Sequence, residues 1–337
     1  MHLFDYVLEK PAYGWVDQKG NFVKPSRAAI WKEFFRRLNI IKNRPGWLSI
    51  LCWGAVILLL PCIYFFVVHY FNMWYALAGF GYGMIIMGTH GTVWYHRYAT
   101  HRSYTYSNKF ARFITSFLVP KMIPEEIYVI SHHVHHAKSD QPGDPYNANG
   151  GWLYCFLADV NHQLISSKLS EPDYHRVSKM LEHTGVPRNS YKSYQKWGSV
   201  TRPLPAIVRM LGSVVFWYLV FYLLGGHILA TALMSGACLW ALGVRTFNYD
   251  GHGRGTDKRK EGIDYNRSDM SINQYWPGFV AGEWHNNHHL YPKSARAGFL
   301  KYQLDLAWCY IFLLYKLGGV KTYYDFKKRF KEHYLSR

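Results

Sequence analysis

Four short histidine clusters constrain this chain more than any other feature of its sequence. The chain has 337 residues and 18 histidines, and half of the histidines fall at metal-ligand spacing inside these clusters. Neutral imidazole is a strong ligand for iron, zinc and copper. Since a protein metal site commonly uses about four ligands, nine imidazoles indicate two metals. The nine are His96, His101, His132, His135, His136, His252, His285, His288 and His289.

The spacing inside the clusters has a physical explanation. Positions three and four apart share one face of an α-helix, so 132–136 and 285–289 each direct three imidazoles to one side. His96 and His101 are five apart and are expected to diverge, as at the end of a loosening helix. A histidine-rich run can also be a solvated or stacking surface, but four such runs in one chain favour metal binding. The clusters contain no Cys, which argues against an iron–sulfur cluster or a Cys-rich zinc site.

Four apolar stretches predict a membrane protein. Spanning a bilayer needs ~20 predominantly apolar residues, and long runs without charge are untypical of the buried helices of soluble proteins. The stretches form two hairpins with very short connections at 71–72 and 225–226. They cover residues 49–70, 73–95, 208–224 and 227–244. The sequence therefore predicts an all-α integral membrane protein with four transmembrane helices in two hairpins.

The distribution of Lys and Arg predicts the orientation. The two hairpin turns carry no Lys or Arg, whereas the flanking segments are rich in both. The positive-inside rule then puts both termini and the histidine clusters in the cytosol, in a bacterial inner membrane or the endoplasmic reticulum. The clusters would form a dimetal site in a cytosolic helical cap. We expect one domain, composed of a cytosolic segment (1–48), a first hairpin (49–95), a cap (96–207), a second hairpin (208–247) and further cap and tail (248–337).

The charge and the cysteine content limit the binding partners that we expect. The net charge of +18 comes from 39 basic and 21 acidic residues spread over the expected cytosolic segments. Attraction to an anionic bilayer surface and recruitment of an acidic electron donor or phosphate-bearing carrier both fit this charge. We expect no nucleic-acid role, since the basic residues do not gather on a separate soluble module. The five cysteines are scattered in apolar stretches, so free buried thiols are expected.

The residues flanking the clusters carry a family resemblance. They resemble the histidine boxes of the integral-membrane fatty acid desaturases, nearest to the acyl-CoA desaturase branch, from about residue 50 to about residue 320. The segments are His96-Arg-Tyr-Ala-Thr-His101 with Arg-Ser-Tyr after it, His132-His-Val-His135-His136 with Asp144-Pro145-Tyr-Asn147 after it, Asn248-Tyr-Asp-Gly-His252, and Gly282-Glu283-Trp-His285-Asn-Asn-His288-His289.

The resemblance implies a function. It implies an oxidoreductase whose two iron ions are bound by the nine histidines, with Asn248 acting through a water and no other catalytic residue. O₂ would be the co-substrate, and two hydrogens would leave a fatty acyl chain to form a C=C bond. Physical chemistry agrees, because zinc has no redox chemistry and all-imidazole ligation suits iron. Electrons would come from a separate donor of the cytochrome b5, ferredoxin or rubredoxin type.

The chain also departs from the acyl-CoA branch. That branch has an Arg-Asp pair directly before the second cluster, where this chain has Ile130 and Ser131. It has Trp three residues before the Asn of the third cluster, where this chain has Arg245. The acyl carrier therefore stays open between CoA, acyl carrier protein, a lipid ester and a free acid.

Small residues near the clusters predict the substrate path. The second and fourth apolar stretches lead directly into His96 and Asn248, so we expect an apolar tunnel between them whose depth selects the oxidised bond. Its expected lining includes Gly83, Gly88, Ala241 and Gly243. Two further histidines are not expected to bind metal. His90 is expected to be a hydrogen-bonded packing residue, and His133 an outer residue of the second cluster.

Three functional hypotheses follow from the sequence. The first is an acyl desaturase, and the second is another membrane diiron oxidase, namely an alkyl hydroxylase, a carotenoid oxygenase or a decarboxylase forming terminal alkenes. The third is a zinc-binding membrane receptor or hydrolase. Nine ligands and the lack of an evident general base weigh against the third. Product analysis separates the first two.

Overall fold

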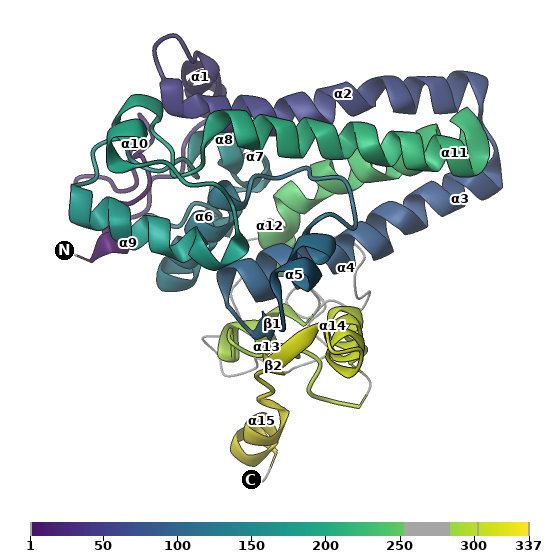
Figure 1. Ribbon diagram of the computed structural model, residues 1–337. Helices are drawn as coiled ribbons and strands as arrows, with labels where there is room; N and C mark the ends of the chain where they lie inside the picture. The colour runs from purple at the N-terminus through teal and green to yellow at the C-terminus, as the bar shows by residue number, and fades with distance from the viewer. Residues whose placement is uncertain (1, 253–283, 302, 336–337) are drawn as a thin grey trace.

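The computed structural model describes residues 2–252, 284–301 and 303–335, and helices dominate it. Gly282 and Glu283 of the last motif lie outside these residues. Figure 1 shows two regions. An apolar arm extends to one side, and a histidine body lies at its base. The arm consists of α2 (Trp47–His69), α3 (Met73–Gly81), η3 (Tyr82–Met87), α4 (Gly88–Gly91) and α11 (Pro203–Gly243).

The arm is built from the apolar stretches. The helical path from 73 continues without a break through η4 (Thr92–Thr100), with π-helical turns in η3 and η4. Inside α11 the chain reverses at Gly225 and Gly226, as expected for the second hairpin. Gly226 has φ 67°, a conformation that glycine adopts without steric penalty. Asn72 caps α3 by accepting hydrogen bonds from the N–H groups of Trp74 and Tyr75.

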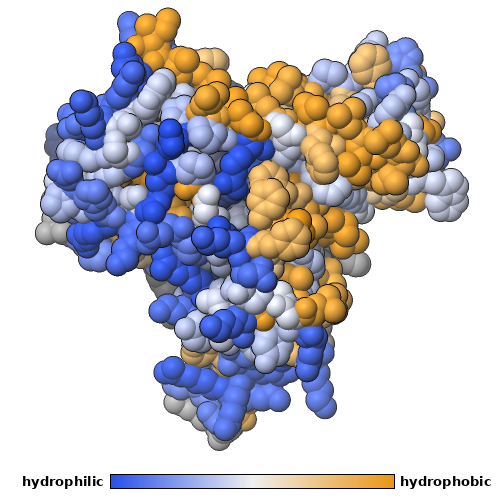
Figure 2. All heavy atoms as spheres, viewed as in Figure 1, coloured by the Kyte–Doolittle hydropathy of each residue, from blue (hydrophilic) through white to orange (hydrophobic). Residues whose placement is uncertain are grey.

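Two helical stretches of the described residues are long and apolar enough to cross a membrane, Arg44–His69 and Pro203–Gly251. The second includes the reversal inside α11. Large apolar side chains lie exposed along the arm, and Figure 2 shows them gathered there while the body is largely hydrophilic. Side chains such as Ala55, Leu59 and Met234 pack α2 against α11 on the inner side.

The histidine body consists of short helices joined by ordered loops. The helix α6 crosses its centre, and η4, α12 and α13 approach α6 from different parts of the chain. The helices are α1 (Arg27–Leu38), α5 (Lys109–Ser116), α6 (Glu125–Lys138), α7 (Trp152–Phe156), α8 (Ala158–Asn161), α9 (Glu171–Leu181), α10 (Tyr191–Trp197), α12 (Phe247–Gly251), α13 (His285–Leu290), α14 (Leu306–Lys316) and α15 (Lys327–Tyr334). The 3-10 turns are η1 (Leu3–Asp5), η2 (Arg44–Gly46), η5 (Ala148–Gly150), η6 (Glu182–Thr184) and η7 (Val244–Thr246).

One small sheet was not expected for an all-α chain. Strands β1 (Tyr104–Tyr106) and β2 (Val320–Tyr323) pair antiparallel, with Tyr104 opposite Tyr323. The sheet joins the chain just after His101 to the C-terminal segment (Figure 1). Beside it, buried Arg97 contacts Asp305 at 2.9 Å and donates a hydrogen bond to the carbonyl of Ala295. These contacts hold the segment after α13 against η4.

Candidate metal centre

The local winding of η4 brings His96 and His101 together. This helix is π-helical, and the N–H of His101 donates to the carbonyl of His96 at 3.1 Å, five residues earlier. In a π-helix, positions five apart lie on one face. The two imidazole rings are 5.1 Å apart between centroids. The expectation that these side chains diverge is therefore wrong, because it assumed α-helical winding.

All nine histidines of the four clusters meet in the body, and they separate into two groups. Within each group the candidate ligand nitrogens lie within 4.8 Å of one another. The first group is His96, His101, His132, His136 and His288, and the second is His135, His252, His285 and His289. The α6 and α13 helices each contribute to both groups.

Specific nitrogen atoms converge within each group. The Nε2 atom of His288 lies 2.9 Å from Nε2 of His96 and 3.0 Å from Nε2 of His136. In the second group, Nε2 of His285 lies 2.9 Å from Nε2 of His252 and 3.0 Å from Nε2 of His289. The same nitrogen of each ring therefore points to a common centre.

Two aspartates orient histidines of the second group. Nδ1 of His135 donates to Asp144 at 3.0 Å, and Nδ1 of His252 lies 2.6 Å from Oδ2 of Asp140. Asp144 is fully buried and also accepts from the N–H of Asp140 at 2.8 Å. A carboxylate on Nδ1 leaves Nε2 as the lone-pair nitrogen and fixes the ring. The sequence motif included Asp144, but the role of Asp140 was missed, because its partner His252 lies 112 residues later in the chain.

The imidazoles fit a metal ion. Burial and the neighbouring imidazoles hold the pKa values of His132, His136 and His288 well below their usual range, so these rings are neutral at pH 7. The Nε2 atoms of His101 and His135 are buried and lack a hydrogen-bond partner among the residues that the structure describes. Buried polar atoms normally have a partner, and a metal ion supplies one. An all-nitrogen donor set suits iron, zinc or copper.

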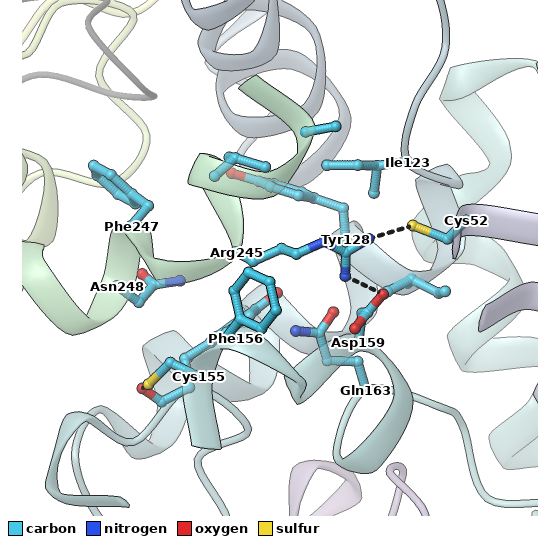
Figure 3. A pocket seen from close by; sticks show the side chains of 14 residues that line it. Cys52, Ile123, Tyr128, Cys155, Phe156, Asp159, Gln163, Arg245, Phe247 and Asn248 are labelled. Atoms are coloured by element: carbon cyan, nitrogen blue, oxygen red, sulfur yellow. Dashed lines mark hydrogen bonds and ion pairs between the residues drawn. The ribbon is translucent and has the colours of Figure 1, made fainter. Parts of the chain in front are cut away.

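Asn248 lies next to the histidine groups and also lines a cavity. Its side chain is buried, and its Oδ1 has no hydrogen-bond partner in the described part of the chain. Its backbone carbonyl accepts a hydrogen bond from the N–H of His252 at 3.0 Å. Asn248 is one of the residues that line a cavity of about 60 Å³ (Figure 3). Its neighbours in the lining are Cys52, Ile123, Ile127, Tyr128, Tyr146, Cys155, Phe156, Asp159, Gln163, Ala241, Val244, Arg245 and Phe247.

The cavity differs from the expected tunnel. Ala241 lines it, but Gly83, Gly88 and Gly243 are not among its lining residues. The expectation that Gly83 lines the tunnel is wrong. A Cβ atom at this position would lie 2.2 Å from the carbonyl oxygen of Gly236. The glycine therefore lets η3 pack against the backbone of α11 and leaves no space for a chain. The cavity lies beside α2, α6, α7 and α8 instead.

Two histidines outside the groups and two residues before the second cluster have other contacts. His90 belongs to neither group, and its Nε2 bonds to the carbonyl of Thr115 at 2.8 Å, which confirms a packing role. His133 stacks on Phe4 with ring centroids 6.1 Å apart, and it too belongs to neither group. Ser131 bonds to the hydroxyl of Tyr146 at 2.7 Å, and Ile130 is buried.

Comparisons with known proteins relate this chain to one family. Residues 72–312 match the family model described as fatty acid desaturase. The chain is 29% identical over 234 residues to an sn-1 stearoyl-lipid 9-desaturase of Anabaena variabilis, covering 67% of this chain and 75% of the relative. It is 28% identical over 266 residues to a hex-5-enoyl-[acyl-carrier protein] acetylenase of Moorena producens (strain JHB), covering 73% and 78%. It is 24% identical over 304 residues to delta-9 acyl-lipid desaturase 2 of Arabidopsis thaliana, covering 89% and 87%.

Proposed function

Since this chain belongs to the fatty acid desaturase family and is an oxidoreductase, we propose that it introduces a C=C bond into a fatty acyl chain with O₂ at a diiron centre. The observation that carries the proposal is the separation of nine histidines into a group of five and a group of four. Two hydrogens leave adjacent carbons of the chain. Together with two further electrons and two protons, they reduce O₂ to two molecules of water.

The nine histidines hold the two iron ions in this proposal. Bound iron supplies the O₂-dependent oxidation that an unactivated C–H bond requires, and zinc has no redox chemistry to do so. The group of five would complete one site. The group of four leaves room for a water, which Asn248 would hold through its unpartnered Oδ1. Asp140 and Asp144 keep the rings of His252 and His135 aligned.

The part of the acyl chain that is oxidised lies in the small cavity next to Asn248. Its lining is mainly apolar, which suits a hydrocarbon and excludes bulk water from the reacting carbons. We favour a carrier other than CoA, because Ile130 and Ser131 are uncharged where the acyl-CoA branch has a charged pair. The named relatives act on lipid-linked or carrier-protein-linked chains, which supports the same choice.

The membrane arrangement and the electron source are also proposals. Four spans in two hairpins would place the arm in the bilayer with both termini and the metal centre in the cytosol. The exposed apolar surface of the arm and the two qualifying helical stretches support it. A separate redox protein would supply the electrons, and the net charge of +18 favours an acidic one.

Product analysis tests the proposed function. Lipids from cells that express the chain should contain new unsaturated acyl chains by gas chromatography–mass spectrometry. Cells that express the His288→Ala variant should not contain them. Because one relative is an acetylenase, triple bonds should be sought in the same samples. Hydroxylated chains or terminal alkenes in place of unsaturated chains would favour the other diiron oxidases.

A further inference from the structure

A buried ion pair forms one wall of the cavity next to Asn248. Nη1 of Arg245 lies 2.5 Å from Oδ2 of Asp159, and the two side chains are only 7% and 9% exposed. Both residues line the cavity, which is otherwise mainly apolar. Burying two charges in a protein is expensive even when they are paired. A hydrocarbon chain makes no favourable contact with such a pair. The presence of two charged residues in the cavity lining therefore indicates a polar group on the ligand.

The contacts of Arg245 leave one of its three guanidinium nitrogens without a partner among the described residues. Its Nη1 atom contacts Asp159, and its Nη2 atom donates a hydrogen bond to Sγ of Cys52 at 3.4 Å. The guanidinium lies 4.1 Å from the ring centroid of Trp53. Its Nε atom is buried and has no hydrogen-bond partner within residues 2–252, 284–301 and 303–335. Figure 3 shows this side chain reaching across the cavity toward Asp159 and Cys52.

A purely structural ion pair does not account for that donor. The pair does join α8 to the turn that leads into α12, and this contact stabilises the site. A buried N–H without an acceptor nevertheless destabilises the fold, because it loses its hydrogen bond to water and gains none in return. The cost is explained if a ligand in the cavity supplies the acceptor.

The charges on the wall indicate which ligand. Asp159 already neutralises Arg245, so a bound carboxylate would leave one negative charge uncompensated in a buried site. A neutral oxygen accepts the Nε–H bond without adding charge. The ester or thioester carbonyl of an esterified acyl chain provides such an oxygen, whereas a free fatty acid presents an anion at neutral pH.

We propose that Arg245 is a specificity-determining residue that binds the neutral carbonyl oxygen of an esterified acyl chain, an inference that rests on the proposed function. Arg245 lies three residues before Asn248, and residues at this spacing in helical segments lie near one another. The carbonyl therefore anchors the chain close to the metal centre. The number of carbons between the bound carbonyl and the metal centre then sets the position of the new double bond.

Binding of three matched probes to the iron-loaded full chain in nanodiscs tests this proposal. Methyl dodecanoate has the carbonyl, dodecyl methyl ether has a methylene in its place, and dodecanoate has a negative charge. We expect the ester to bind about tenfold more tightly than the ether, as for one hydrogen bond to a charged group. The ester should also bind more tightly than dodecanoate. Equal binding of ester and ether, or a preference for dodecanoate, would overturn the proposal.

Two variants separate recognition from structural support. The double variant Arg245→Met with Asp159→Asn leaves no unpaired buried charge, and it should retain iron while losing the ester preference. Asp159→Asn alone leaves the charge of Arg245 uncompensated, so dodecanoate should become the tightest ligand. Exposed Arg176→Met is the matched control and should keep the ester preference. Retention of that preference by the double variant would contradict the role of Arg245.

Measuring product formation distinguishes an error about Arg245 from an error about the proposed function. If the parent chain makes unsaturated products but binds the ester and the ether equally, only the role of Arg245 is wrong. If the parent chain loaded with iron makes no oxidised acyl product and binds none of the three probes, the proposed function fails, and the inference fails with it.

Discussion

The apolar arm and the histidine body bury opposite kinds of side chain. On the arm, Leu58 is 55% exposed and Leu223 is 82% exposed. In the body, the side chains of His135 and Asp144 are both fully buried. Exposing the apolar surface of the arm to water would be unfavourable in free energy. Burying the polar side chains of the body is unfavourable unless their polar atoms have partners. The surface of the arm therefore suits contact with lipid, and the core of the body suits a bound metal ion.

The largest effect should come from removing a histidine of the body. His288 is buried and its Nε2 faces those of His96 and His136. We expect His288→Ala to lose bound iron and to lose activity beyond the ~10–100-fold typical of residues that only orient a ligand. His175→Ala, at a side chain 64% exposed, is the control and should retain both. An active, iron-replete His288→Ala protein would remove this residue from the site.

A charge on the arm should have the next largest effect. A Lys at the centre of a membrane helix costs about 2.5–3.5 kcal/mol on insertion scales. We expect Leu58→Lys to lower membrane insertion, measured as the protein recovered in the membrane fraction. Ile41→Lys is the matched change, because Ile41 is 92% exposed and lies outside the arm. Equal recovery of the two variants would show that the arm surface does not face lipid.

Removing an orienting aspartate should have a smaller effect. Asp144→Asn keeps the size of the side chain but weakens the hydrogen bond to Nδ1 of His135. We expect activity to fall by about 10–100-fold, with iron affinity reduced and the protein still folded. Asp17→Asn, in an exposed turn, is the control. Unchanged activity in Asp144→Asn would mean that His135 does not need this carboxylate.

The smallest effect concerns packing within the arm. A Cβ atom at Gly83 would meet the backbone oxygen of Gly236, whereas a Cβ at Gly81 would meet nothing within 4 Å. We expect Gly83→Ala to destabilise the arm by about 1–3 kcal/mol, as for overpacked cores. Gly81→Ala should not. Thermal denaturation in detergent compares the two, and equal midpoints would place η3 farther from α11 than the structure does.

The sequence predicted which histidines form the two groups' shared cluster because their spacing is local. The α6 and α13 triads follow from the period of the α-helix alone. The convergence of His96 and His101 depends on π-helical winding, which the same spacing does not reveal. The contact between Asp140 and His252 joins residues more than a hundred positions apart, so no local pattern could indicate it.

The errors about the arm and the sheet have similar causes. A small residue in an apolar helix fits either a tunnel or a close helix contact, and only the position of Gly236 distinguishes the two at Gly83. The strands β1 and β2 have three and four residues, too few to show an alternating pattern. Arg245 was recognised as a departure from the family pattern, but its pairing with Asp159 needed the fold.

The central claim is that the body holds two iron ions through nine histidines. Elemental analysis of the purified chain, expressed with iron and zinc both present, tests this claim most directly. We expect two irons per chain, with little zinc, and loss of iron in the His288→Ala variant while His175→Ala keeps two. One metal per chain, or zinc in place of iron in an active preparation, would contradict the account.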